Sequence, residues 1–315
     1  MQAPMPTALY THPACKLHKL GEHHRECPER IQAIENELVA CGLDRVLDYR
    51  LAPEASIANL RRVHLIDTIE TVRDNTPAEP DDYFGIHDVH INMHSWNAAL
   101  RAAGAGIAAV DALLAGEIAN AFCLVRPIGH HATPSTPMGF CVFNNVAIAA
   151  MHALKVRGLE RVAIVDIDVH HGNGTDDAFA HEPRAMMVSF YQAYLYPFMG
   201  NERQRDHMVN VPVYAGSDGY AVRKLVTEQW LPALHVHKPE MIFISAGFDA
   251  HRDDPLGSIN LVEDDYAWIT QQIMAVADMH AQGRIVSFLE GGYNLKALAK
   301  SAAAHIKTLA HRSTA

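Results

Sequence analysis

The sequence of 315 residues has few cysteines, no long hydrophobic run and no excess of positive charge. The five cysteines are odd in number and none form a C-x-x-C pair, so neither a disulfide framework nor a thiolate zinc site is indicated. No run of 18 apolar residues occurs, and the N-terminus has no basic segment followed by an apolar core. We therefore expect a cytoplasmic protein without a membrane span. The formal net charge of -10 argues against nucleic acid as a direct partner and favours cationic substrates.

Apolar segments alternate with amphipathic segments along most of the chain. We expect strands at residues 8–10, 121–125, 162–167, 185–189, 241–245 and 285–289. We expect helices at residues 28–41, 95–114, 145–156, 219–236, 264–282 and 295–309. Residues 43–94 show no clear pattern, and we expect a long loop at the polar segment DDYFGIHDVHINMHS, residues 81–95. Such alternation predicts an α/β fold with a parallel sheet covered on both faces. No repeat, low-complexity tract or linker interrupts it, so we expect residues 1–315 to form one domain.

The segment RVAIVDIDVHHGNG, residues 161–174, combines a buried strand with polar side chains at its end. Two carboxylates, Asp166 and Asp168, and two imidazoles, His170 and His171, follow within six positions. Because residues two apart in an extended chain point the same way, Asp168 and His170 can bind one ion. The alternative is an ordinary strand-to-helix turn, with an aspartate capping the next helix and solvated or packed histidines.

The other polar motifs also follow predicted strands: RPIGHHA, AGFDAHRDDPLG and EGGYN. Ligands of parallel sheets bind at the carboxyl ends of strands, so we expect these motifs to converge on one pocket. Asp168, His170 and one carboxylate of DAHRDDP then form a three-ligand set with a free coordination position. Open sets of this kind are typical of catalytic zinc.

Amide hydrolysis at such a metal needs a base, an acid and a donor for the oxyanion. Of the adjacent His130 and His131, a ring backed by a carboxylate such as Asp166 would be held cationic. A ring backed by the neutral Asn173 could act as general base and then acid. The Tyr293 hydroxyl could donate to the developing oxyanion, although a packed aromatic on a turn is the alternative.

Other aromatic and histidine residues allow two interpretations. Phe140 and Tyr196 could form the walls of an apolar channel, or they could belong to the core. His18, His23 and His24 could be metal ligands, but no spacing around them matches a closed metal site. We therefore expect these histidines in a surface loop.

Five motifs in order, RPIGHHA, GFCVFNN, VDIDVHHGNGT, SAGFDAHRDDPLG and LEGGYNL, resemble the zinc-dependent histone deacetylase superfamily, which includes acetylpolyamine amidohydrolases. The resemblance runs from about Pro28 to Leu298. It implies an arginase-like α/β sandwich around a mostly parallel sheet of eight strands. It also implies an enzyme that removes an acetyl or other acyl group from a lysine side chain, with zinc and a structural potassium ion bound. Small acetylated amines such as acetylpolyamines are the alternative substrates.

The resemblance also implies roles for individual residues. The zinc ligands would be Asp168, His170 and Asp254. The catalytic residues would be His130 with Asp166, His131 as general base with Asn173, and Tyr293 as oxyanion donor. The substrate tunnel would include Gly139, Phe140, Tyr196, the gatekeeper Leu261, and Arg30 at the acetate pocket. The monovalent cation would be bound by Asp166, Asp168, His170, Ser189 and Phe190.

Two details of the sequence refine this resemblance. Asn173 resembles the class II branch, since class I carries Asp at that place. Leu261 stands where the eukaryotic polyamine-specific branch carries Glu, which favours acylated lysine as substrate. Two other protein classes remain as alternatives. A manganese ureohydrolase would need additional carboxylates that bridge two metal ions. A catalytically silent metal-binding protein would not need His130, His131 and Tyr293 together.

Overall fold

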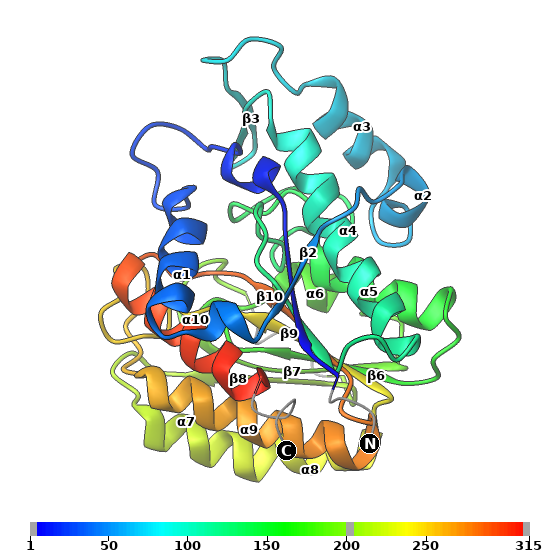
Figure 1. Ribbon diagram of the computed structural model, residues 1–315, viewed down its shortest axis with the longest axis vertical. Coiled ribbons are helices and arrows are strands. Elements are labelled where there is room, and N and C mark those ends of the chain that lie inside the picture. The colour runs from blue at the N-terminus through cyan, green and yellow to red at the C-terminus, as the bar shows by residue number, and fades with distance from the viewer. Residues whose placement is uncertain (1–4, 200–204, 311–315) are drawn as a thin grey trace.

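The computed structural model describes residues 5–199 and 205–310, and its centre is a sheet of eight parallel strands (Figure 1). In spatial order the strands are β2 (Asp48–Leu51), β1 (Thr7–Thr11), β5 (Asn120–Cys123), β10 (Ile285–Leu289), β9 (Met241–Ala246), β6 (Val162–Asp166), β7 (Ala185–Gln192) and β8 (Met208–Val213). A separate antiparallel hairpin pairs β3 (Phe84–Ile86) with β4 (Val89–Ile91). The expected α/β class with a parallel eight-stranded sheet is confirmed.

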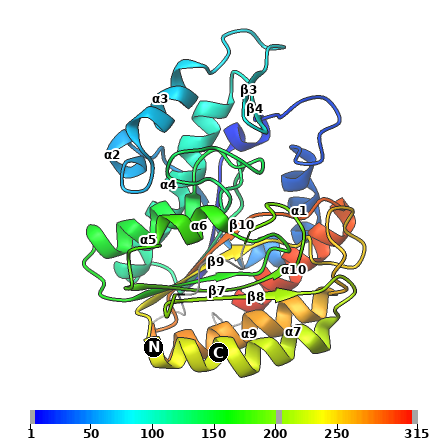
Figure 2. The ribbon, with the colours of Figure 1, turned by 180° about the vertical axis from the view of Figure 1, so that it is seen from behind.

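Helices cover both faces of this sheet. They are α1 (Glu29–Ala40), α2 (Ile57–Leu60), α3 (Ile66–Asp74), α4 (Ser95–Leu114), α5 (Asn145–Lys155), α6 (Asn173–Ala178), α7 (Gly219–Leu225), α8 (Leu231–His237), α9 (Glu263–His280) and α10 (Leu295–Ala310). Figures 1 and 2 show α7, α8 and α9 together on one side of the sheet, with α4 and α5 on the other. By length and composition alone α4 could cross a membrane, but 67% of its apolar window is buried inside the protein, as in a core helix.

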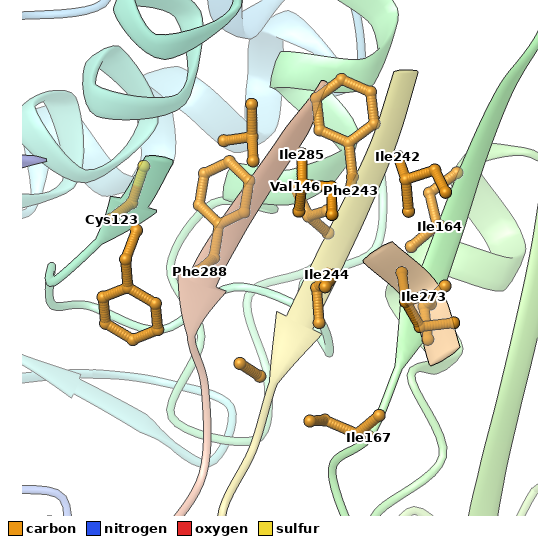
Figure 3. Packing of buried hydrophobic residues seen from close by; sticks show 14 of the residues in the cluster. Cys123, Val146, Ile164, Ile167, Ile242, Phe243, Ile244, Ile273, Ile285 and Phe288 are labelled. Atoms are coloured by element: carbon orange, nitrogen blue, oxygen red, sulfur yellow. The ribbon is translucent and has the colours of Figure 1, made fainter. Parts of the chain in front are cut away.

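The central strands are buried on both faces, which explains their continuous apolar runs. Figure 3 shows Phe243 and Phe288 packed with Ile164, Ile242 and Ile285 across β6, β9 and β10. The six strands expected from the sequence are present within a residue or a few at each end. The expected helix at 219–236 is present as α7 and α8, joined by a π-helical turn at Val226–Trp230.

The prediction of a long loop at residues 81–95 is wrong, and the whole stretch of residues 43–94, which shows no clear pattern in the sequence, contains regular elements. This stretch contains β2, α2, α3 and the β3–β4 hairpin. Its buried residues, among them Ile69, Ile86 and Ile91, form a second apolar cluster with Phe143. The prediction of a surface loop is also wrong for His18, which is fully buried with Nδ1 2.7 Å from the Ser95 hydroxyl. The polar composition of these segments did not indicate buried residues, because short strands and helices bury only some of their side chains.

The topology brings the polar motifs together. The strands β5, β10, β9 and β6 are consecutive neighbours in the sheet and run in the same direction. Residues 126–132, 290–294, 247–257 and 167–173 directly follow these four strands. The four motifs therefore meet at one edge of the sheet, at the carboxyl ends of its central strands.

Candidate active site

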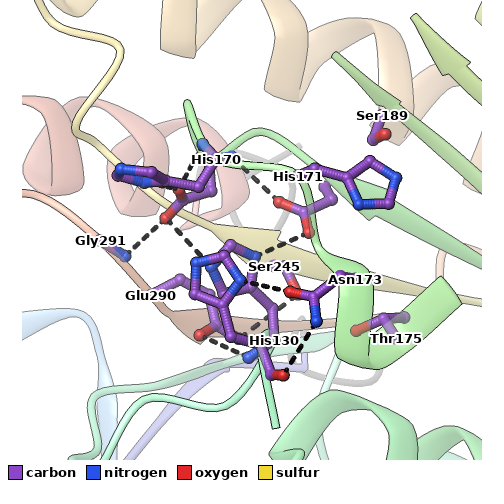
Figure 4. A network of polar contacts seen from close by, with 12 residues as sticks. His130, His170, His171, Asn173, Thr175, Ser189, Ser245, Glu290 and Gly291 are labelled. Carbon is purple, nitrogen blue, oxygen red and sulfur yellow. Dashed lines mark hydrogen bonds and ion pairs between the residues drawn. The ribbon is translucent and has the colours of Figure 1, made fainter. Parts of the chain in front are cut away.

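The loop after β6 is held by its own carboxylates. Asp166 accepts a hydrogen bond from the Asp168 backbone N–H at 3.0 Å, and Asp168 accepts one from the His170 N–H at 2.9 Å. These bonds turn Asp168 and His170 toward the neighbouring strand ends. His171 points to the other side, where its ring packs against Tyr191 with centroids 4.9 Å apart (Figure 4).

In the described part of the chain, one group of side chains could hold a metal ion: Asp168, His170 and Asp249. Their ligand atoms all lie within 4.8 Å of one another. His170 Nδ1 is 2.9 Å from Asp168 Oδ1 and 3.1 Å from Asp249 Oδ2. Burial, and then the Asp168 charge, raise the pKa of Asp249 to about 7. Two buried carboxylates this close are stabilised by a cation between them, so the donor set fits a zinc ion.

Backbone glycines close tightly around these carboxylates. A Cβ at Gly291 would collide with Asp249, and a Cβ at Gly247 would collide with Asp168. The Gly291 N–H also donates to Asp168 Oδ2 at 2.8 Å. The glycines of the AGFD and EGGY motifs are therefore needed for the close approach of backbone to the metal-binding carboxylates.

For the third metal ligand, the structure groups Asp249 with Asp168 and His170, whereas the Asp254 expected from the sequence makes other contacts. Asp254 Oδ2 accepts the backbone N–H groups of Tyr293 and Asn294 at 2.6 and 3.2 Å, and Oδ1 accepts that of Leu256 at 2.9 Å. Asp254 thus fixes the Tyr293 loop and lies outside the metal-binding group. Spacing alone could not choose among the carboxylates of DAHRDDP. Asp249 comes soon after Ala246, the last residue of β9, and Asp254 as a zinc ligand stays a prediction.

The tandem histidines have different partners. His130 Nδ1 is 3.0 Å from Asp166 Oδ2, and His131 Nδ1 is 2.8 Å from Asn173 Oδ1, with the two ring centroids 4.0 Å apart. Burial lowers the pKa of both rings. For His130 the charges of Asp168 and Asp166 outweigh burial and hold the pKa well above its usual value. For His131 burial and the neighbouring His130 charge hold the pKa well below it.

These partners create a cationic ring next to a neutral ring. A neutral His131 beside the metal-binding group has a free Nε2 and can accept a proton, whereas a cationic His130 cannot. The partners are those expected for the two histidines from the sequence. The catalytic roles themselves stay predictions.

Glu290 is a buried acid in this site to which the sequence motifs assign no role. Its Oε2 accepts the backbone N–H groups of Gly129 and His130 at 2.7 and 3.1 Å, and Oε1 accepts the Ser245 hydroxyl at 3.4 Å (Figure 4). The side chain is fully buried, and burial raises its pKa to about 7. The pattern that could have revealed it is an acid directly after the apolar strand 285–289, where a buried carboxylate needs partners.

Tyr293 faces the same pocket from the loop after β10. Burial, and then the Asp249 charge, raise the pKa of its hydroxyl well above the usual value, so it stays a proton donor at neutral pH. The Arg30 guanidinium lies 5.1 Å from the centre of the Tyr293 ring, and its Nε donates to the Gly292 carbonyl at 2.7 Å. Arg30 also donates to the Glu290 carbonyl. Arg30 therefore supports the Tyr293 loop from the buried side.

Two aromatic side chains lie beside His131 and Tyr293, and their role as channel walls stays a prediction. The Tyr196 ring stands edge-on to His131, with centroids 5.1 Å apart, and the Phe140 ring stands edge-on to Tyr293 at 6.0 Å. Gly139 packs against the His131 ring, because a Cβ there would collide with it. Leu261 is different. It is fully buried in the main core and donates its N–H to the Ala250 carbonyl, and its role as gatekeeper stays a prediction.

Of the residues expected to bind a monovalent cation, Ser189 and Phe190 lie on β7, and Asp166, Asp168 and His170 lie at the end of the neighbouring β6 and in the loop after it. The Ser189 hydroxyl donates to Asn210 at 2.7 Å, and the Phe190 ring stacks on Trp230 with centroids 5.9 Å apart. The potassium site stays a prediction.

Comparisons with known proteins agree with this site. The family model described as histone deacetylase domain matches residues 24–309. Histone deacetylase 14, chloroplastic, of Arabidopsis thaliana is 36% identical over 309 residues, covering 91% of this chain and 73% of that protein. Polyamine deacetylase HDAC10 of Mus musculus is 34% identical over 319 residues, covering 96% of this chain and 46% of that protein. The crystal structure of the HDA15 HD domain matches with a TM-score of 0.91 at 31% identity, over 98% of this chain and 90% of that one.

The family match covers most of the chain and includes every motif of the sheet edge. The family is zinc-dependent, in agreement with the buried group of Asp168, His170 and Asp249. The chain therefore belongs to the histone deacetylase family and is a deacetylase, a hydrolase of amide bonds.

Proposed function

We propose that this deacetylase uses zinc to hydrolyse the acetyl amide of a protein lysine side chain. The observation that carries the proposal is the pair of histidines with opposite pKa shifts beside a buried metal-binding group. Asp168, His170 and Asp249 would hold the zinc ion. When bound, zinc lowers the pKa of a coordinated water and polarises a carbonyl group.

The protein side chains supply the proton transfers. His131 takes the proton of the attacking water at Nε2, because its ring is neutral and its Nδ1 side is occupied by Asn173. The Tyr293 hydroxyl donates to the carbonyl oxygen as negative charge develops on it. The amide C–N bond breaks, His131 returns the proton to the leaving nitrogen, and acetate and an amine are released. His130, held by Asp166, orients its neighbour and keeps its positive charge.

Two aromatic side chains beside the site favour a lysine substrate. Phe140 and Tyr196 provide apolar walls, which suit the straight aliphatic arm of an acetylated lysine. A second candidate is an acetylated small amine, because one relative is named a polyamine deacetylase and the net charge of -10 favours cationic substrates.

Zinc content and turnover test the proposal together. The substrates are an acetyl-lysine peptide and acetylputrescine, and the variants are His131→Ala and, as a control, His181→Ala, an exposed histidine between α6 and β7. We expect one zinc per chain in every variant, turnover by the wild type and His181→Ala, and a loss of about 100-fold or more in His131→Ala. Zinc-loaded wild type that hydrolyses neither substrate would contradict the proposal, and preference for acetylputrescine would select the second candidate.

A further inference from the structure

Four large aromatic side chains are exposed where β7 and β8 end and α7 begins. They are Tyr194, Phe198, Tyr214 and Tyr220, with exposed fractions of 84%, 77%, 68% and 79%. Single exposed apolar residues are common on globular proteins, but a group of aromatic residues is typical of surfaces that bind a partner. We call these four residues the aromatic ledge.

The aromatic ledge is carried by neighbouring elements. The strands β7 and β8 pair in parallel and lie side by side (Figure 2). Where they end, the Ala193 N–H donates to the Val213 carbonyl at 2.8 Å, so the backbones of Tyr194 and Tyr214 leave the sheet next to each other. A short turn then leads from Tyr214 into α7, whose second residue is Tyr220.

Phe198 connects the aromatic ledge to the candidate active site. Its ring lies edge-on to the Tyr196 ring with centroids 6.3 Å apart, and the Tyr196 ring lies edge-on to His131 with centroids 5.1 Å apart. A line of aromatic rings thus runs from the proposed general base to the exposed surface. Because an acetylated lysine must reach His131, the residues beside it in its own polypeptide come next to Phe198.

The loop after β7 is anchored although its rings are exposed. The Gln192 N–H donates to the Val169 carbonyl at 2.8 Å, the Phe198 N–H donates to the Leu195 carbonyl at 2.8 Å, and Leu195 packs against the main core. Tyr194 and Phe198 have left-handed backbones with φ of 63° and 62°. Such a backbone is unfavourable for bulky residues, so contacts of this kind must hold it. An anchored loop that presents aromatic rings loses little conformational entropy on binding.

We propose that the aromatic ledge binds an apolar or aromatic side chain next to the acetylated lysine of a protein substrate. The inference rests on the proposed function, and within it the ledge favours a polypeptide over a small amine. Acetylputrescine has no neighbouring residue that could reach Phe198, whereas a peptide covers the exposed rings with apolar surface. This burial is the same before and during the reaction, so the ledge lowers KM and leaves kcat unchanged.

Steady-state kinetics test the aromatic ledge. The substrates are a peptide with phenylalanine on each side of acetyl-lysine, the same peptide with glycine in those places, and acetylputrescine. Phe198→Asn removes the ring and introduces a residue that tolerates a left-handed backbone. We expect its KM for the phenylalanine peptide to rise roughly 10-fold with kcat unchanged, as when a central contact of an interface is removed. Its KM for the glycine peptide should rise less, and its KM for acetylputrescine should not change.

A second variant tests the part of the aromatic ledge farther from the pocket. Tyr214→Ser should raise the KM of peptides of about nine residues and not that of peptides of about three, because only the longer chain extends that far. The control is Val236→Asn, which removes an exposed apolar side chain of α8 and should match the wild type with every substrate. An unchanged KM in Phe198→Asn, an equal rise with acetylputrescine, or a long peptide insensitive to Tyr214→Ser would overturn the ledge.

A binding measurement separates this inference from the proposed function. Fluorescence anisotropy of the labelled phenylalanine peptide is compared with and without Phe198→Asn, both in the His131→Ala background so that the peptide is not consumed. We expect roughly 10-fold weaker binding with Phe198→Asn. Weaker binding in a protein whose wild type hydrolyses none of the substrates would support the aromatic ledge and contradict the proposed function. A peptide that does not bind, or that is hydrolysed by the wild type and bound equally well with Phe198→Asn, would overturn the ledge.

Discussion

Tyr293 provides a single hydroxyl for the developing oxyanion, and its pKa is raised by burial and by Asp249. We expect Tyr293→Phe to lower kcat by roughly 10²–10³-fold, the cost of removing one oxyanion donor. The zinc content should not change, since the Asp254 bond goes to the Tyr293 backbone N–H and the hydroxyl is not part of the metal-binding group. Turnover equal to that of the wild type would show that this hydroxyl does not contact the reacting carbonyl.

Asp249 and Asp254 are buried acids in the same loop with different contacts. Asp249→Asn should lower zinc affinity strongly, because an amide is a poor ligand in place of a charged carboxylate beside His170. Asp254→Asn should retain zinc and lower kcat, because Asp254 orients the Tyr293 loop through backbone N–H groups. Metal analysis of the two purified variants separates the assignments. Zinc lost from Asp254→Asn and retained by Asp249→Asn would restore the ligand expected from the sequence.

Site residues can be predicted from the sequence when the side chains that act together are close neighbours along the chain. Asp168 and His170 share one strand end, and that spacing is visible in any extended segment. The choice of Asp249, the burial of Leu261 and the role of Glu290 depend on which strands are neighbours. Sheet order is a property of the whole fold, so residue spacing alone could not provide it.

At the scale of elements, Glu290 connects the end of β10 to the loop after β5. Glu290→Ala would leave the buried N–H groups of Gly129 and His130 without an acceptor, which costs roughly 2–4 kcal/mol of unfolding free energy. Glu290→Gln keeps an acceptor oxygen and should lose much less. Ser245→Ala is the matched control, because it removes only the 3.4 Å contact to Oε1. Urea unfolding checks the order of stabilities, and an alanine variant as stable as the glutamine variant would contradict it.

Within the eight-stranded sheet, the strands that were not expected from the sequence are the two edges, β2 and β8. Along β2 half-buried and exposed residues alternate, and in β8 only Met208 and Val213 are buried. A central strand such as β6 is buried at all five positions and appears as an apolar run. A hydrophobic pattern therefore identifies central strands more readily than edge strands. An edge strand has a neighbouring strand on one side only, and it carries more polar residues.

At the scale of the whole molecule, buried neutral histidines connect the layers. His305 of α10 is fully buried, with Nδ1 2.7 Å from the Thr270 hydroxyl on α9 and Nε2 2.8 Å from the Ser287 hydroxyl on β10. Burial lowers the pKa of His305 to about 3 and that of His64 to about 4. These rings stabilise the fold only while they are neutral.

Acid should therefore destabilise the protein through these histidines. Between pH 3 and 6.5 an unfolded His305 binds a proton and the folded one does not, so its contribution is present above pH 6.5 and is lost as the pH falls. From pH 7.5 to 5.0 the loss is about 2 kcal/mol for this residue. His305→Gln should be less stable than the wild type at pH 7.5 but lose about 2 kcal/mol less on acidification. Urea unfolding at both pH values measures this, with the exposed His181→Gln as control. Equal pH dependence in His305→Gln and the wild type would mean that His305 does not remain neutral in the folded protein.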